Sequence, residues 1–143
     1  MTEPVTFFVQ GDPKGQPRAR ACVRGKHAGV YDPGTADGWK LAVADGWRQQ
    51  DRKEFAAAVR LNLVFYFRRP KSHFRTDGTL KPGAPKQHLS KPDADNLAKA
   101  VMDQLTRLRA WADDRLVCTL TVRREWAKTE AGCHIIISEE AAA

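Results

Sequence analysis

Cysteine is scarce in this sequence, and its few positions form no recognisable pattern. The chain of 143 residues has three cysteines, an odd number, and no two of them are separated by only two residues. This arrangement argues against a disulfide framework and against a zinc ribbon. We expect Cys22, Cys118 and Cys133 to be reduced, small apolar side chains, as in most cytoplasmic proteins.

Long apolar runs are also missing. Ile135-Ile136-Ile137 is far too short to cross a bilayer, because a spanning helix takes about 20 apolar residues. The first residues, MTEPVTFFVQGDPKG, contain neither a basic segment nor an apolar stretch of the length found in signal peptides. We therefore expect a cytoplasmic protein that has no membrane partner.

Acidic residues are in the minority. The chain has 17 Asp and Glu against 24 Lys and Arg, which gives a formal net charge of +7. Such a balance on a small chain favours a polyanionic partner, because each phosphate that a base neutralises releases condensed counterions. Many basic proteins bind no nucleic acid, so the net charge alone leaves the partner open.

Neither an internal repeat nor a linker between two cores is visible, so we expect one domain over residues 1–143. Apolar residues alternate in the expected strands and recur every three or four positions in the expected helices. Strands are predicted at 5–10, 58–67, 115–126 and 132–138, and helices at about 36–52, capped by Thr35 or Asp37, and at 94–109. The order β-α-β-α-β-β predicts an α/β fold in which a mixed four-stranded sheet packs against two helices.

Two long segments, at about 11–34 and 68–92, are expected to be loops that carry much of the positive charge. The second has seven Lys or Arg residues and four prolines, with Asp77 as its only acid. For any single base, a solvated loop side chain is the simpler explanation, but as a group these residues are candidates for contacts to DNA phosphates. The candidates are Lys14, Arg18, Arg20, Arg68, Arg69, Lys71, Arg75, Lys86 and Lys91.

Carboxylates gather around the second expected helix. Asp93 and Asp95 follow Pro92 at the start of the helix, where free backbone N–H groups favour negative charge. Lys99 comes four residues after Asp95 and therefore lies on the same helix face. The pair Asp113-Asp114 lies in the short connection to the next strand, and a compact α/β unit brings such a connection back toward the helix.

This combination of residues suits metal-dependent phosphodiester hydrolysis. Mg²⁺ takes oxygen ligands, usually one or two carboxylates together with water and substrate phosphate. A bound metal activates water and stabilises the charge on the phosphate, and a nearby Lys offsets more of that charge. In this scheme Asp93, Asp95 and Asp114 are the metal ligands, and Lys99 is the cation.

Each part of the pattern also has a plainer explanation. An Asp at a helix start is often only a cap, and Asp113-Asp114 could cap a turn. Asp95, Lys99 and Asp103, spaced by four, could form a solvated ladder of ion pairs. Their joint occurrence in a basic chain favours the metal site, because so many carboxylates repel one another unless a cation compensates.

The acidic motif resembles that of the RusA-type Holliday junction resolvases of bacteria and prophages. The resemblance rests on KPDADNLAKAVMDQL at 91–105 and WADD at 111–114, where every fixed position of the family pattern is present without a gap. The stretches GDPKGQPRAR and RRPKSHF resemble the phage-borne branch of that family. The resemblance extends over residues 4–138, and its diagnostic part is the acidic motif at 91–114.

The resemblance implies a homodimer that binds four-way DNA junctions and cuts two strands symmetrically, using Mg²⁺ or Mn²⁺ and no small-molecule cofactor. It implies that the catalytic aspartates are Asp93, Asp95 and Asp114 and that the essential lysine is Lys99. The long loop at 68–91 is a departure, since the shorter family members lack it. Their cleavage-sequence preference is therefore not transferred to this chain.

Two more aspartates match family positions. Asp103 would mainly orient Lys99, and Asp113 is a further candidate metal ligand. Among the aromatic residues, Trp39, Trp47, Phe65 and Phe67 are expected in the core. Trp111 either packs at a dimer interface or closes the helix end. The histidines show no ligand spacing. His73 and His88 lie in the basic loop, where they either contact phosphate or are inert surface residues.

The sequence thus predicts a structure-selective DNA endonuclease, dependent on Mg²⁺, that resolves Holliday junctions by paired hydrolysis in recombination and repair. A nuclease acting on flaps or other branched DNA would use the same residues, so only substrates separate the two activities. The alternative from another class is a non-catalytic protein that binds branched DNA, a degenerate resolvase. The intact carboxylates argue against it, because a protein that only binds DNA gains nothing from groups that repel phosphate.

Overall fold

The computed structural model describes residues 3–17, 20–24, 27–31 and 35–141, with the backbone alone for 20–24 and 27–31. Its strands are β1 (Val5–Gln10), β2 (Arg20–Arg24), β3 (His27–Tyr31), β4 (Val59–Phe67), β5 (Val117–Trp126) and β6 (Gly132–Glu139). Its α-helices are α1 (Asp37–Arg48) and α2 (Ala94–Arg107). Two single turns of 3-10 helix are also present, η1 (Lys71–His73) before α2 and η2 (Asp114–Leu116) after it. The α/β architecture expected from the sequence is confirmed.

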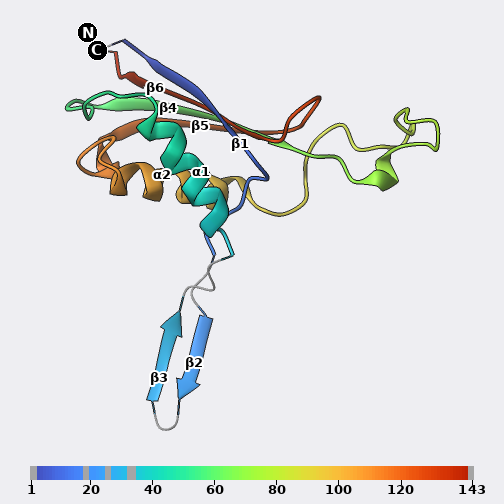
Figure 1. Ribbon diagram of the computed structural model, residues 1–143, viewed down its shortest axis with the longest axis horizontal. Coiled ribbons are helices and arrows are strands. Elements are labelled where there is room, and N and C mark those ends of the chain that lie inside the picture. The colour runs from blue at the N-terminus through green and yellow to red at the C-terminus, as the bar shows by residue number, and fades with distance from the viewer. Residues whose placement is uncertain (1–2, 18–19, 25–26, 32–34, 142–143) are drawn as a thin grey trace.

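Four strands form one mixed sheet in the order β1-β6-β4-β5. The edge strand β5 runs parallel to β4, whereas β6 pairs antiparallel with both β1 and β4. Both helices lie on the same side of this sheet, so its other face has no helix over it (Figure 1). The mixed four-stranded sheet packed against two helices is therefore confirmed as well.

The core lies between the sheet and the two helices. On β4, Leu61, Leu63 and Phe65 are completely buried and alternate with more exposed residues, because successive side chains of a strand point to opposite faces. The predicted aromatic core residues Trp39, Trp47, Phe65 and Phe67 are all buried. Burying one large apolar side chain contributes about 1.5–3 kcal/mol, so these contacts dominate the stability of the domain.

Helix α1 comes close to the sheet at a glycine. A Cβ atom at Gly46 would stand 3.1 Å from the Phe7 ring and 3.1 Å from Val9, both on β1. The start of α1 differs from the expectation, since the N-cap is the buried Ala36 and no side chain caps it. The predicted cap by Thr35 or Asp37 is therefore wrong. Asp37 is instead the first residue of the helix, where its charge suits the positive end of the dipole.

The end of α2 is closed by a tryptophan. Arg109 adopts the left-handed conformation with φ of 64°, which turns the chain after the helix. Trp111 is completely buried, and its Nε1 donates a hydrogen bond of 2.8 Å to the Thr106 hydroxyl in the last turn. The two possibilities left open for Trp111 are thereby decided in favour of helix closure, because a side chain fully covered by its own chain presents no surface to a partner.

The first segment expected to be a loop contains a hairpin. Strands β2 and β3 pair antiparallel, from Arg20 opposite Tyr31 to Arg24 opposite His27, and make a sheet of their own. Figure 1 shows this hairpin standing away from the four-stranded sheet. The prediction of a loop over 11–34 is therefore wrong for this part. The glycines and prolines of this segment led to the prediction of a loop. The two strands are short and pair with each other alone, so their sequence pattern is weak.

The second basic segment does lack a regular strand or α-helix. Apart from η1 and a single bridge between Phe74 and Leu80, residues 68–92 follow an irregular path. Figure 1 shows this segment, here called the basic arm, extending beyond the end of the sheet before it returns to α2. The expectation of a long basic connection is confirmed.

The cysteines of the described residues are free. Cys133 is buried on β6, and burial raises the pKa of its thiol well above the ordinary range. Cys118 is exposed on β5 and is also free, which agrees with the expectation of reduced cysteines. The side chain of Cys22 lies outside the described residues. Within the part of the chain that the structure describes, neither helix is long and apolar enough to cross a bilayer.

Candidate metal and DNA-binding site

Four charged side chains of the acidic motif line one groove between α2 and the sheet. Asp95, Lys99 and Asp103 come from successive turns of α2, and Asp114 comes from η2. The rest of the lining of this hollow of about 560 Å³ is apolar and consists of Ala94, Ala98, Met102, Leu120 and Val122. The structure therefore brings Asp95, Lys99 and Asp114 together, as predicted, although Asp114 is far from Asp95 in the chain.

The charges in this groove are open to solvent and do not neutralise one another. Asp95, Lys99, Asp103 and Asp114 are all exposed. None of them takes part in an ion pair within 4.0 Å among the described residues. The ladder of ion pairs that would have explained the spacing of four is therefore not formed, and these groups remain available to external ligands.

Asp93 lies on the adjoining side of the helix start. It occupies the N-cap position with an extended backbone, φ −71° and ψ 156°, but its side chain accepts no capping hydrogen bond. The exposed carboxylate lines a separate hollow with Gly15, Gln16 and Asn96. Capping therefore does not account for Asp93, but the structure does not place it in the groove with Asp95 and Asp114.

Asp113 has a structural role. Its Oδ1 accepts a hydrogen bond of 2.8 Å from the backbone N–H of Arg115, which caps η2. This is the turn cap that the adjacent pair of aspartates suggested as the plainer explanation. Asp114 is not engaged in this way and is free to face the groove on α2.

The donor set suits a hard divalent cation. Among residues 3–17, 20–24, 27–31 and 35–141, no three His, Cys, Asp or Glu side chains gather closely enough to hold a metal. Mg²⁺ does not need three, because it commonly takes one or two carboxylates and completes its shell with water and substrate phosphate. Asp95 and Asp114 offer that minimum, with oxygen donors only, in a groove open to a phosphate.

The segment after β1 supports the start of α2, which the sequence did not reveal. The Gln16 N–H donates to the carbonyl oxygen of Asn96 at 3.0 Å. A Cβ atom at Gly15 would stand 3.1 Å from both Asn96 and Pro92, so only glycine lets the chain pass without displacing them. Gly15 and Gln16 thus line the hollow beside Asp93. In the sequence, Gly15 indicated only a loop and gave no sign of this contact with α2.

Arg124 on β5 is a second residue that the sequence did not single out. Its Nη1 donates to the carbonyl oxygen of Ser90 at 2.9 Å and to that of Pro92 at 3.1 Å. These bonds fix the returning end of the basic arm just before Asp93. Nothing in the local sequence distinguishes Arg124 from the neighbouring Arg123, because the contact depends on how β5 lies beside the arm.

His88 is a buried residue of the arm itself. It is 5% exposed and stacks on Phe67 with 3.9 Å between ring centroids. Burial, and secondarily the charge of Arg124, lowers the pKa of His88 below its ordinary value, so the ring is neutral at pH 7. A buried ring of this kind is not presented to a ligand at the surface, so His88 serves the packing of the arm. His73 lies edge-on to Trp126 at 5.1 Å and helps to hold the arm.

The model of the endodeoxyribonuclease RusA family matches residues 10–138 of this chain. The match spans nearly the whole sequence and contains both the acidic groove and the basic arm. The chain belongs to the RusA family. The resemblance to RusA-type Holliday junction resolvases is thereby confirmed, and the mixed sheet with two helices agrees with that family's fold. No curated protein matches the chain. Its place in the phage-borne branch stays a prediction.

The bases predicted to bind DNA in this RusA chain occupy different settings. Lys14, Arg68, Lys71, Arg75, Lys86 and Lys91 are exposed. Arg69 is held inside the arm, since its Nη1 donates to the Pro85 carbonyl at 2.8 Å and its guanidinium lies 5.1 Å from the Trp126 ring centroid. Arg18 lies outside the described residues, and for Arg20 only the backbone is described.

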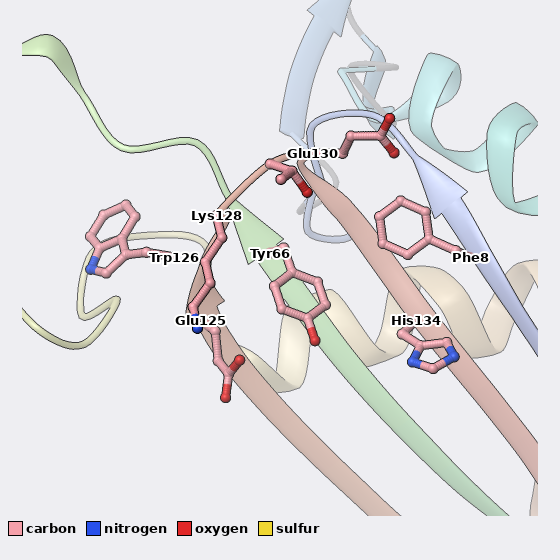
Figure 2. Close-up of a pocket in the computed structure, with 8 residues that line it drawn as sticks. Phe8, Tyr66, Glu125, Trp126, Lys128, Glu130 and His134 are labelled. Atoms are coloured by element: carbon pink, nitrogen blue, oxygen red, sulfur yellow. The ribbon is translucent and has the colours of Figure 1, made fainter. Parts of the chain in front are cut away.

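A separate hollow of about 490 Å³ lies on the sheet face that carries no helix. Figure 2 shows Phe8, Tyr66 and His134 on neighbouring strands, with α2 passing behind the sheet. The rings of Phe8 and Tyr66 are tilted, with centroids 6.4 Å apart. This hollow shares no residue with the acidic groove of the RusA motif and therefore belongs to a different surface.

Proposed function

We propose that this RusA-family chain is a divalent-metal-dependent endonuclease that resolves Holliday junctions by paired, symmetric hydrolysis of phosphodiester bonds. The observation that supports it best is the shared groove of Asp95, Lys99 and Asp114, three exposed charges from separate parts of the motif. A protein that only bound DNA would gain nothing from unpaired carboxylates there, because they repel phosphate.

Asp95 and Asp114 are the proposed protein ligands of Mg²⁺ or Mn²⁺. Asp93, at the N-cap of α2, is the proposed third carboxylate ligand. Asp113 is the aspartate least suited to bind the metal, because its side chain already caps η2. When bound, such an ion supplies an activated water and stabilises negative charge on the phosphate. The carboxylates in turn orient the site and make DNA binding in the groove depend on a cation, since without one they repel the backbone.

Lys99 is the proposed phosphate-binding cation. Lys99 lines the groove, one turn of α2 from Asp95 and one from Asp103, and it makes no ion pair with either among the described residues. It is therefore available to donate to a non-bridging oxygen of the scissile phosphate, where charge builds up as the bond breaks. Asp103, one turn further along α2 and in the same groove, is the proposed residue that orients Lys99.

Symmetric cutting requires two such sites, so the proposed active form is a homodimer on a four-way DNA junction. A symmetric dimer places two copies of the acidic groove on a junction that itself has approximate two-fold symmetry. The proposed role is the resolution of junctions in DNA recombination and repair.

The test is cleavage of a labelled synthetic four-way junction in Mg²⁺, with linear duplex and a flap as other substrates. Wild type should make paired nicks in opposite arms and leave duplex intact. Asp95→Asn should abolish cutting and keep or strengthen junction binding, because a repulsive charge is removed. Asp45→Asn, an exposed change of the same kind on α1, is the control and should cut normally.

Two results would contradict the proposal. Tight junction binding by wild type with no cutting in Mg²⁺ or Mn²⁺ would identify a binding protein with a vestigial motif. Preferential cutting of the flap would place the chain among nucleases that act on other branched DNA.

A further inference from the structure

Basic side chains gather in a second groove, between the basic arm and the edge strand β5. This arm groove is a hollow of about 740 Å³, and its charged lining is Arg69, Lys86, Arg123, Arg124, Lys128 and Glu125. We propose that the arm groove binds the sugar–phosphate backbone of a DNA strand. The proposal rests on the proposed function, because it names a surface that holds the substrate of that same site.

The charge of the groove is strongly one-sided. Five bases face a single acid, and that acid, Glu125, is already paired with Arg123 at 2.9 Å. None of the other four bases forms an ion pair among the described residues. Like charges held around one hollow repel each other, so an anion that enters it gains attraction and relieves that repulsion.

The arm groove is held in shape by contacts within the chain. Arg69 holds the outer part of the arm through the Pro85 carbonyl, and Arg124 holds its returning part through Ser90. The aromatic Trp126 lies between these anchors, 5.1 Å from the Arg69 guanidinium. Because these contacts already fix both walls of the groove, a bound ligand would lose little binding free energy to ordering them.

The groove also leads to the acidic motif. Arg124 lines the groove and donates to the carbonyl oxygen of Pro92, one residue before Asp93. A strand in the arm groove would therefore be held beside the start of α2. Positive charge spread along both the arm and β5 fits a chain of phosphates, and exposed apolar residues such as Leu80 give its sugars a surface.

The deciding experiment removes two exposed bases that anchor nothing. Lys86→Gln with Lys128→Gln is the test pair, because neither lysine makes a hydrogen bond within the described chain, whereas Arg69 and Arg124 do. Lys81→Gln with Lys53→Gln is the control pair, since it removes the same charge from exposed positions outside the groove. All binding is measured in the uncut Asp95→Asn background over a salt series.

The test pair should weaken junction binding about tenfold or more and lower the slope of log K against log salt by about 1.8, because each phosphate contact contributes about 0.9. The loss of affinity should be equal on junctions of different sequence, since contacts to the DNA backbone carry no sequence information. A loss no greater than in the control pair, or one that depends on sequence, would overturn the proposal.

The experiment distinguishes failure of the arm-groove proposal from failure of the proposed nuclease function. If the test pair binds normally while wild type cuts junctions, only the arm groove is wrong. If wild type cuts nothing but the test pair loses affinity selectively, the groove binds DNA and the nuclease proposal is wrong. Melting temperatures of both pairs, expected to match the parent, show whether each variant is folded.

Discussion

Lys99 stands on α2 one turn after Asp95 and one turn before Asp103. A lysine between two carboxylates would ordinarily be explained by ion pairing. Here none of the three is paired among the described residues, and all are exposed on one groove. At the scale of the residue, the site is therefore defined by charges that lack an internal partner, not by burial.

Replacing Lys99 by Met should lower the rate of junction cleavage by about 100- to 1000-fold, the range for removing one positioned donor at a developing charge. Junction affinity should change by less than tenfold, because one exposed base is a small share of the DNA contacts. Single-turnover cleavage and binding titrations measure the two effects. Lys40→Met on α1 is the control, and equal losses in both variants would argue against a catalytic Lys99.

His88 gives the domain a dependence on pH. Its pKa in the folded protein is lowered below the ordinary value of 6.5, first by burial and then by Arg124. Well above pH 6.5 the ring is neutral in both the folded and the unfolded state and has no effect on stability. Below it the unfolded chain takes up a proton that the folded chain resists, so stability falls until pH reaches the folded pKa.

The fall in unfolding free energy between pH 7.5 and pH 5.5 should therefore be smaller in His88→Phe than in wild type. Urea denaturation at the two pH values measures it, and His134→Gln, on the other face of the sheet, serves as the control. An identical pH dependence in wild type and His88→Phe would show that the buried histidine does not cause it.

At the scale of the element, β5 connects the two proposed binding surfaces, the acidic groove and the arm groove. Its Arg124 anchors the arm, and its Leu120 and Val122 line the acidic groove. The parallel pairing of β5 with β4 sets all three contacts at once, because it decides which residues of the edge strand face α2.

Arg124 is accordingly a positioning residue. Arg124→Met should lower the unfolding free energy by about 1.5–3 kcal/mol, since hydrogen bonds from a charged donor are lost. It should also raise the Mg²⁺ concentration for half-maximal cleavage, and Arg124→Lys should restore part of that shift. A merely structural role would reduce stability and leave the Mg²⁺ dependence unchanged, which titration of cleavage against Mg²⁺ tests directly.

The pairing of β1 with β6 depends on Gly132. A Cβ atom there would stand 2.2 Å from the Val9 carbonyl oxygen and 2.6 Å from the Phe8 ring, so the strands would have to separate. Gly132→Ala should lower the unfolding free energy by about 1–3 kcal/mol, the usual range for overpacking. Gly83→Ala, where a Cβ meets nothing within 4 Å, should be nearly neutral. Equal midpoints in chemical denaturation would contradict the close approach.

At the scale of the whole molecule, the proposed chemistry demands two copies of the site. Sedimentation at micromolar protein with a four-way junction should show two chains on each junction. A single chain per junction, together with unpaired nicks, would rule out symmetric resolution. Raising the salt concentration should weaken this complex steeply, because the net charge of +7 is concentrated on basic segments that release counterions from DNA.

The sequence was sufficient for local features. Alternation on β4 and the helical spacing of Leu97, Val101 and Leu105 predicted elements whose bounds agree with the structure to within a few residues. The acidic motif identified the family because its spacing is a property of the chain itself. The hairpin of β2 and β3 was missed, since local glycine and proline content outweighed two short strands that pair only with each other.

The sequence by itself determined the charges, the acidic motif and the order of the main elements, because each depends on residues close together in the chain. Only the tertiary structure decided that Asp95 and Asp114 share a groove while Asp93 lies beside it. The structure also decided that Arg124 anchors the arm and that His88 is buried. These outcomes depend on the packing of β5 against β4 and of α2 against the sheet, contacts between distant residues that no local pattern records.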